Sequence, residues 1–190
     1  LDEEVRNRFE SAVEVLRAAG VNIREQSLPI LDDCDDLFLE RPLVVREVWD
    51  FHRDMLVQHF DEYDPFVGTR LRLGADISDA EQQSRIVARG QVVNAFEREF
   101  ADLQADALLY PTVVCIPPKI AETDDEENAR RVNMRCLRNT ATVNYFNGCA
   151  ISLPCHEKGE APVGLMLSAA NGQDESLYRI AAAVEAALGR

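Results

Sequence analysis

Apolar residues recur at helical spacing near both ends of the chain. After Asp2 and two glutamates, apolar residues recur at helical spacing before Gly20, at Val5, Phe9, Val13 and Leu16. Near the other end, Asp174 and Glu175 precede apolar positions at Leu177, Ile180, Ala181, Val184 and Leu188, and Gly189 follows. Acidic residues favour the first turn of a helix and glycine favours its end. The pattern predicts an amphipathic helix at each end of the chain.

The interior pattern predicts further helices. Residues 78–81 form a capping box, Ser-Asp-Ala-Glu, and open a helix whose apolar positions are Ile86, Val93, Phe96, Phe100 and Leu103. Gly90 lies inside this helix, where it weakens helix formation, and it is interpreted as a mark of close packing. Residues 30–60 predict one or two helices interrupted near Pro42. Residues 123–126 form a second capping box, which leads a helix through Val132, Met134 and Leu137.

Short apolar runs bounded by turn residues predict strands. Residues 21–27 alternate between apolar and polar positions, and residues 106–110 form a buried run that ends at Pro111. The runs 150–153 and 163–167 are separated by nine residues, which suits a wide hairpin. Strand–helix alternation gives a helix-rich α/β fold, and residues 1–190 are long enough for one domain with a substantial core.

The composition limits the possible partners and the cellular setting. The chain has 20 Lys and Arg residues against 34 Asp and Glu residues, for a net charge of −14. Nucleic acids and anionic membranes require a basic surface, so neither is expected as a partner. No apolar run approaches the roughly 18 residues of a membrane helix, and no secretory signal is visible. Five cysteines without a C-x-x-C motif favour reduced thiols and a cytoplasmic location.

Several polar clusters invite interpretation as metal or nucleophilic sites. The acidic residues 32–36 lack the glycine and terminal glutamate of a calcium loop and are interpreted as a solvated helix start. Cys149 and Cys155 are too far apart for a zinc pair, and the adjacent residues Cys155 and His156 point to opposite faces of a strand end. These cysteines are interpreted as small buried apolar residues. His52 and His59 are seven residues apart on a predicted helix, so they share one face of it. They are interpreted as an ordinary interfacial or surface pair of histidines.

A family resemblance emerges from four segments taken together. These are Arg-Asn-Thr at residues 138–140, followed by Asn144, the run 150–155, and Gly-Glu-Ala-Pro-Val-Gly-Leu-Met-Leu at residues 159–167. With Leu-Leu-Tyr-Pro-Thr at residues 108–112, their order and spacing resemble the C-terminal region of amidase-signature hydrolases. Enzymes of that family cleave carboxamide C–N bonds with a Ser-Ser-Lys triad. The resemblance covers essentially the whole chain, but only the second part of such an enzyme. It implies strands that form part of the family's mixed sheet.

The resemblance also implies that the catalytic residues lie elsewhere. In that family, the nucleophile and the bridging serine lie in a Ser/Gly-rich stretch, and the base is a lysine further upstream. The seven serines of this chain are scattered, and its two lysines, Lys119 and Lys158, lie in a loop and a charged turn. No catalytic residue is therefore predicted here. The triad is expected upstream of Leu1, and this chain alone is expected to be inactive.

The resemblance assigns a supporting role to residues of this chain. Thr112 and Val113 match a segment that lines the acyl pocket of similar enzymes. Arg70 lies in an Arg-x-Arg-x-x-Gly pattern that looks like one near that pocket. Surface or packing roles remain equally open for all three. Three further polar positions match a hydrogen-bonding scaffold: Asn139, Thr140 and Asn144. The expected ligand is a small-molecule amide, and no metal or organic cofactor is implied.

Two other functions remain open. One is a non-catalytic binding or assembly module with an amidase-like fold. The other is the A subunit of a glutamyl-tRNA amidotransferase. The second is weakened because residues 147–150 read Asn-Gly-Cys-Ala where the family often has Gly-Leu-Pro-Ala. A portion of a larger fold is expected to expose an apolar face, or to bury that face in a homodimer.

Overall fold

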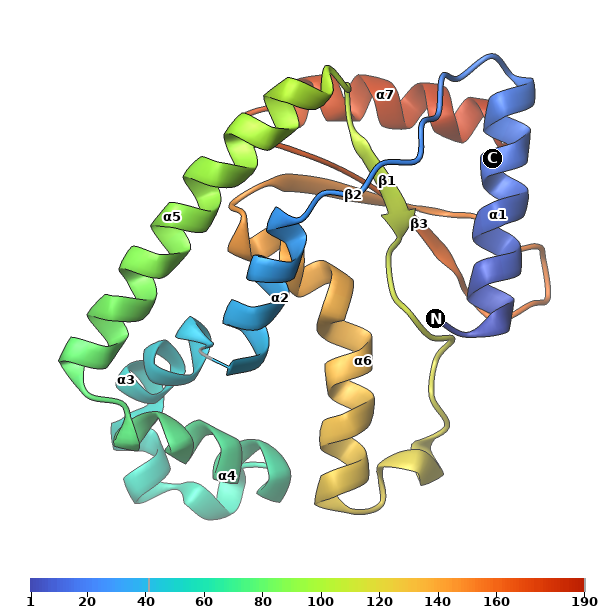
Figure 1. Cartoon of the computed structure of the whole chain (residues 1–190). Helices are drawn as coiled ribbons and strands as arrows, with labels where there is room; N and C mark the ends of the chain where they lie inside the picture. The colour runs from blue at the N-terminus through green and yellow to red at the C-terminus, as the bar shows by residue number, and fades with distance from the viewer. Residues whose placement is uncertain (41, 190) are drawn as a thin grey trace.

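The computed structural model describes residues 1–40 and 42–189, which form seven α-helices, three 3₁₀ turns and three strands (Figure 1). The helices are α1 (Glu3–Ala18), α2 (Ile30–Glu40), α3 (Leu43–Gln58), α4 (Pro65–Arg72), α5 (Asp79–Leu103), α6 (Glu126–Tyr145) and α7 (Asp174–Ala187). The strands are β1 (Leu108–Pro111), β2 (Cys149–Pro154) and β3 (Gly164–Ala169). The 3₁₀ turns are η1 (Phe60–Glu62), η2 (Leu73–Asp76) and η3 (Ile120–Thr123). The predicted helix-rich α/β class is confirmed.

The sheet is antiparallel and has the order β1-β3-β2 in the described chain. In the β2–β3 hairpin, Cys149 lies opposite Ala169 and Pro154 lies opposite Gly164. The predicted wide hairpin is therefore confirmed. On the other edge of β3, β1 pairs with it from Leu108 to Pro111. Two of the predicted strands thus meet as a hairpin, and a third, distant in sequence, completes the sheet.

β3 contributes to two separate cores. Its alternate residues Leu165 and Leu167 join a core between the sheet, α1 and α7, which includes Val5, Leu16, Leu153, Leu177 and Val184. Met166 points to the other side, into a core formed with α2, α5 and α6, which includes Cys34, Leu37, Phe96, Val143 and Phe146. Successive side chains of a strand point to opposite faces. A strand covered on both faces reads as a continuous apolar run, as β3 does.

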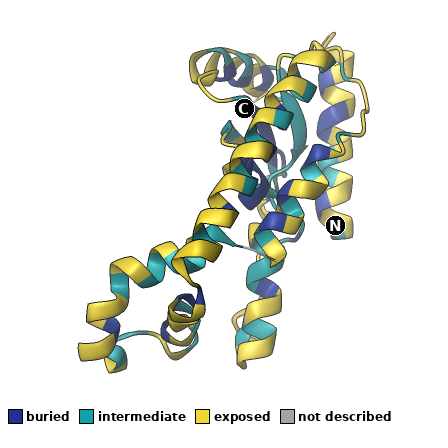
Figure 2. Ribbon diagram, turned by 60° about the vertical axis from the view of Figure 1, so that its left-hand side comes forward, coloured by how far each residue is buried: buried dark blue, intermediate teal, exposed yellow. Residues whose placement is uncertain are grey.

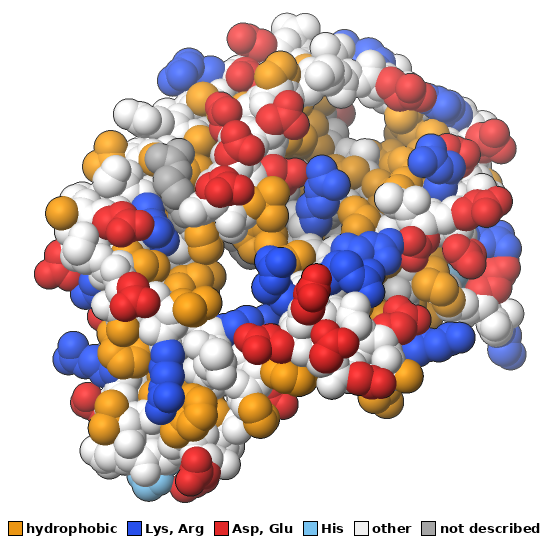
Figure 3. Space-filling view, turned by 60° about the horizontal axis from the view of Figure 1, so that its bottom comes forward, with side chains coloured by type: hydrophobic (Ala, Val, Ile, Leu, Met, Phe, Trp, Pro, Cys, Tyr) orange, Lys and Arg blue, Asp and Glu red, His pale blue; other side chains and the backbone are white. Residues whose placement is uncertain are grey.

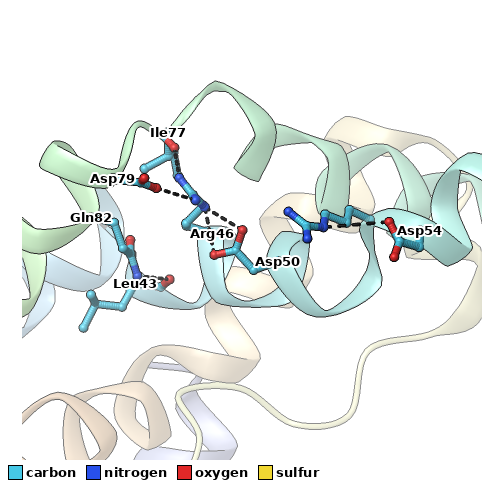
Figure 4. Close-up of polar contacts among 8 residues, drawn as sticks. Leu43, Arg46, Asp50, Asp54, Ile77, Asp79 and Gln82 are labelled. Atoms are coloured by element: carbon cyan, nitrogen blue, oxygen red, sulfur yellow. Dashed lines mark hydrogen bonds and ion pairs between the residues drawn. The ribbon is translucent and has the colours of Figure 1, made fainter.

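Helices α3 and α4 form a less buried region beside the two cores (Figure 2). Leu56 is the buried residue of α3, whereas Phe51 is 81% exposed. Arg46 ties α3 to the start of α5: its guanidinium binds Asp50 at 2.8 Å and Asp79 at 2.6 Å, and it donates to the carbonyl oxygen of Ile77 (Figure 4). The predicted break near Pro42 lies between α2 and α3.

Of the two predicted capping boxes, the structure confirms one and differs at the other. The Ser78 Oγ accepts a hydrogen bond of 3.2 Å from the Glu81 amide, as the first capping box predicts. The second predicted box is wrong, because Asp125 caps α6 by accepting from the Asn128 amide at 2.9 Å. The Thr123 hydroxyl donates to the carbonyl of Ile120 instead. Asp125 directly precedes the first residue of α6, so its carboxylate, and not the Thr123 hydroxyl, is the capping group.

Two other expectations are wrong. Residues 21–27 form no strand, because no neighbouring strand pairs with their backbone among the described residues; the Arg24 side chain instead donates to the carbonyl of Leu103 at 2.7 Å. Gly90 does not mark close packing, since a Cβ built there would meet no atom within 4 Å. As for membranes, no helix within residues 1–40 and 42–189 is long and apolar enough to cross one.

The stacked phenylalanines of the second core give a direct stability test. Phe96 is fully buried, and its ring centroid lies 3.8 Å from that of Phe146. We expect Phe96→Ala to lower the free energy of unfolding by about 3–5 kcal/mol, because it removes a buried aromatic ring and leaves a cavity. Chemical denaturation measures this. Tyr178→Ala, at a side chain of α7 that is 67% exposed, is the matched control and should change stability by less than about 0.5 kcal/mol. Equal effects would contradict the assignment of the core.

Candidate functional site

Two hydroxyl groups meet where the ends of the strands come together. Thr112 follows β1, and its amide donates to the carbonyl of Gly164 at 2.8 Å. Its Oγ1 lies 2.5 Å from the Oγ of Ser152 on β2. β1 and β2 lie on opposite edges of β3, so the hydroxyl pair bridges the central strand at Gly164. Sequence reasoning identified Thr112 but missed Ser152, whose partner becomes visible only through the strand register.

Gly164 makes this bridge possible. A Cβ built on Gly164 would lie 2.6 Å from both Ser152 Oγ and Thr112 Oγ1. Such a separation is far below van der Waals contact, so any side chain at this position would push the two hydroxyls apart. The glycine is required here for close approach rather than for an unusual backbone angle.

The hydroxyl pair lies in the wall of an open groove with a volume of about 410 Å³. Apolar residues supply most of the lining: Val5, Val113, Ile116, Pro117, Pro118, Pro154, Pro162 and Val163. The polar groups are few: Thr112, Ser152, His156 and the thiols of Cys115 and Cys136. A concave, largely apolar surface with a few placed polar groups is typical of small-molecule sites. The structure thus brings the predicted residues Thr112 and Val113 together in one groove.

Polar contacts with α1 and α6 fix the loop that lines this groove. The Asn139 side chain on α6 donates to the carbonyl of Pro111 at 2.6 Å, in agreement with its predicted scaffold role. Asp2 accepts from the Ile116 amide at 3.2 Å, and its own amide donates to the carbonyl of Val114 at 2.8 Å. The other carboxylate oxygen of Asp2 pairs with Arg135. Asp2 therefore holds the loop, rather than capping α1 with its side chain.

The thiols of Cys115 and Cys136 lie side by side in the groove wall. Cys115 is buried, Cys136 is half-buried, and their sulfur atoms are 3.8 Å apart. Burial raises the pKa of the Cys115 thiol to about 11, and the hydrogen bond with Cys136 acts in the same direction. Sequence reasoning missed this pair because a spacing of 21 residues, from loop to helix, carries no recognisable motif.

The other candidate residues have structural contacts. Cys155 is buried, and Cys149 packs against the same core, as their interpretation as small apolar residues predicts. The ring of His156 lies 3.2 Å from both backbone polar atoms of Val163. His52 contacts the Tyr63 hydroxyl at 2.8 Å. Within the described part of the chain, no three His, Cys, Asp or Glu side chains are grouped so as to hold a metal ion.

Arg70 lies apart from the groove. It is half-buried in the last turn of α4, which packs against α3 (Figure 1). Its neighbour Arg72 stacks over the ring of Phe60 at 3.6 Å. The structure therefore does not bring Arg70 together with Thr112 and Val113 in this groove. A role for Arg70 in substrate binding stays a prediction, one that requires a pocket wall formed by other parts of the enzyme.

Charge is unevenly distributed over the surface. In Figure 3, Lys and Arg side chains gather around a hollow near the centre of one face, while acidic side chains lie around them. A second depression, of about 520 Å³, lies between α1 and the hairpin loop and is lined by Glu4, Asn7, Arg8, Glu160, Ala161 and Val163. Arg8 and Glu160 pair with each other there. Because Arg8 and Glu160 neutralise each other, this depression is a weaker candidate for a ligand site than the groove at Thr112.

Residues 1–178 match the family model described as Amidase. The chain belongs to the amidase family. It is 31% identical to the 2-amino-5-chloromuconic acid deaminase of Comamonas testosteroni over 195 residues, which cover all of this chain and 41% of that protein. It is 33% identical to the A subunit of the glutamyl-tRNA(Gln) amidotransferase of Halobacterium salinarum over 114 residues, which cover 60% of this chain and 26% of that protein.

Solved structures share the fold of this amidase-family chain. A crystal structure of an amidase superposes with a TM-score of 0.77 at 23% identity and covers 95% of this chain and 41% of its own. The 6-aminohexanoate cyclic dimer hydrolase complexed with substrate also has a TM-score of 0.77, at 20% identity, with coverages of 100% and 42%. The chain thus spans about two fifths of these proteins, and its resemblance to part of an amidase-signature enzyme is confirmed.

The departure from the family pattern at residues 147–150 has a local explanation. Asn147 has a φ of 59°, in the left-handed region that glycine prefers and asparagine tolerates. It occupies the position where the family pattern often has glycine. Gly148 packs against the ring of Phe146 and the carbonyl of Ala169, where a Cβ would lie 2.2 Å and 2.5 Å from them.

The close approach at Gly164 predicts opposite effects for two glycine substitutions. We expect Gly164→Ala to destabilise the protein by about 1–3 kcal/mol, because the new methyl group displaces both hydroxyls and strains the sheet. Gly90→Ala is the matched control: it lies in α5 with open space around it and should stabilise by up to about 1 kcal/mol. Thermal or urea unfolding of both variants measures the difference. A neutral Gly164→Ala variant would contradict the geometry of the hydroxyl pair.

Proposed function

We propose that this chain is the C-terminal portion of an amidase that hydrolyses a carboxamide C–N bond. We further propose that the groove at Thr112 and Val113 holds the acyl part of the substrate. Membership in the amidase family supports the reaction class, and the groove at the end of β1 supports the position of the pocket. The observation that carries the proposal is the hydroxyl pair of Thr112 and Ser152 in a largely apolar, concave surface.

The proposed reaction uses a serine nucleophile from the upstream portion of the enzyme. The serine attacks the amide carbonyl, ammonia or an amine departs, and water hydrolyses the resulting ester. The lysines of this chain do not fit the base. Lys119 and Lys158 are both exposed, one before η3 and one in the β2–β3 connection, and neither lines the groove. The role proposed for this chain is to shape the pocket and to hold the substrate in position.

We propose a small-molecule carboxamide as the substrate. The Comamonas relative is named as a deaminase of 2-amino-5-chloromuconic acid and matches this chain along its whole length, which supports a small ligand. In the groove, the hydroxyls of Thr112 and Ser152 are among the groups able to hydrogen-bond a polar substituent, while Val113 and Ile116 contact its apolar part. The proposed partners accordingly include neither a nucleic acid nor a membrane.

The amidotransferase A subunit is a second candidate, favoured by several relatives with that name. Ammonia release distinguishes the candidates, since both cleave a carboxamide but on different compounds. Release from a panel of small carboxamides would support the proposal. Release from glutamine alone would favour the amidotransferase. No release from any amide by the longer protein, with ligand binding retained, would favour the non-catalytic module.

The position of the catalytic residues gives a separate test. We expect the 190-residue chain to release no ammonia above the buffer rate from any carboxamide that the longer protein hydrolyses, because it lacks the nucleophile and the base. Circular dichroism of the same sample controls for folding. Turnover by the folded chain alone would contradict the upstream location of the triad.

The role of the groove is tested by removing one hydroxyl without changing side-chain volume. In the longer protein, we expect Thr112→Val to lower kcat/KM by about 3- to 10-fold, which corresponds to one lost hydrogen bond of about 0.5–1.5 kcal/mol. Thr69→Val is the matched control, because the Thr69 hydroxyl contacts the Pro65 carbonyl on α4 and not the groove. Equal kcat/KM values for both variants would exclude Thr112 from the substrate pocket.

The exposed apolar side chains of α3 raise the question of what covers them. Phe51 is 81% exposed and Val57 is 77% exposed. Such a face is expected to be covered by the rest of the enzyme or in a homodimer. We expect gel filtration of the 190-residue chain to show either a dimer or a monomer that binds a hydrophobic dye. A monomer that binds no dye would favour a self-sufficient binding module.

A further inference from the structure

Cys115 and Cys136 come from different parts of the chain and meet in one wall of the groove. Cys115 lies in the loop after β1, and Cys136 lies on α6. Their sulfur atoms are 3.8 Å apart. A disulfide bond requires about 2.05 Å, so the two sulfur atoms must approach by roughly 1.8 Å to form one.

The surrounding contacts hold the two thiols in this arrangement. Asp2 contacts the backbone on both sides of Cys115: its main-chain amide donates to the carbonyl of Val114, and its carboxylate accepts from the amide of Ile116. The carboxylate also pairs with Arg135, the residue directly before Cys136. One side chain therefore ties the segment that carries the first thiol to the helix that carries the second. This arrangement does not depend on what the groove binds.

We propose that Cys115 and Cys136 form a redox-active dithiol, a modification site at which low-molecular-weight disulfides oxidise the pair to an intramolecular disulfide. The half-buried Cys136 thiol loses its proton to solvent, and its sulfur attacks one sulfur of the reagent to form a mixed disulfide; the released thiolate takes up a proton. The Cys115 thiol then loses its proton to solvent and attacks the Cys136 sulfur, which releases the second reagent thiolate, and this also takes up a proton. Overall, two protein thiols and one reagent disulfide give one protein disulfide and two reagent thiols, with two electrons transferred to the reagent.

The remaining cysteines are placed differently. Cys34 is fully buried in the second core, and burial raises the pKa of its thiol to about 12. The Cys149 thiol contacts the carbonyl of Ala170 at 3.4 Å at the start of β2. Cys155 is buried in the first core. Within the described chain, Cys115 and Cys136 are the thiols that combine a neighbouring sulfur with access from a groove.

The new bond would link the loop after β1 to α6 beside Thr112. The oxidised protein would then have one wall of the groove fixed by a covalent bond. Any effect of this bond on substrate binding rests on the proposed function. Formation of the disulfide itself does not rest on it. The test therefore uses no amidase assay, and its result is independent of the proposed reaction.

Peptide mapping tests the proposal directly. The protein is incubated with oxidised glutathione, quenched with acid, alkylated and digested with trypsin. We expect a linked pair of peptides, residues 99–119 joined to residues 136–138, that disappears on reduction. It should form at least about tenfold faster in the folded protein than in urea, because the fold raises the effective concentration of one thiol near the other. Formation no faster than in urea, or a reaction that stops at glutathione bound to Cys136, would overturn the proposal.

Variants separate this pair from general thiol reactivity. Cys115→Ser and Cys136→Ser should each abolish the linked peptides, whereas Cys149→Ser should leave their yield unchanged. Asp2→Asn tests the positioning of the pair: it should slow formation several-fold without blocking it, and Asp102→Asn, at an exposed position on α5, is its matched control. Linked peptides formed at the normal rate in Asp2→Asn would overturn the positioning role of Asp2. Loss of the linked peptides in Cys149→Ser would overturn the assignment of the pair.

Discussion

The burial of β3 on both faces is the constraint on which the rest of the structure depends. Leu165 and Leu167 face one core and Met166 faces the other, so both faces of the strand are apolar and must be buried. Both of its edges are also paired, with β1 and β2. Helices must therefore cover both faces of the sheet, with α1 and α7 on one side and α2, α5 and α6 on the other. The groove lies where this covering ends, beside the exit of β1 and the start of β3.

Much of this arrangement could be predicted from the sequence because the signals are local. The Ser78 cap, the acidic start of α7 and the β2–β3 hairpin each depend on residues close in sequence. Wrong predictions arose where two local signals competed or where a partner was required. Asp125 took the cap from Thr123. Residues 21–27 alternate like a strand, but alternation forms a strand only when a neighbouring backbone is free to pair with it.

The candidate site was predictable only in part, and for a related reason. Thr112 and Val113 were identified because they follow a strand in a recognisable family pattern. Ser152 was not, because its contact with Thr112 arises from two strands that each pair with β3 and never with each other. The dithiol was missed for the same reason, since Cys115 and Cys136 are brought together by tertiary packing. Arg70 shows the converse: a local pattern matched the family, yet α4 carries it away from the groove.

Asp2 shows how one residue can satisfy a local rule and serve a distant contact. It stands at the N-cap position of α1, where a carboxylate commonly accepts a hydrogen bond from the first turn. Its carboxylate instead binds the amide of Ile116 and the guanidinium of Arg135. The contact with Arg135 joins two charged groups, and the contact with the Ile116 amide is part-buried, whereas a cap would join the carboxylate to a neutral amide of the first turn. The groove wall, and the spacing of the two thiols within it, follow from that choice of partner.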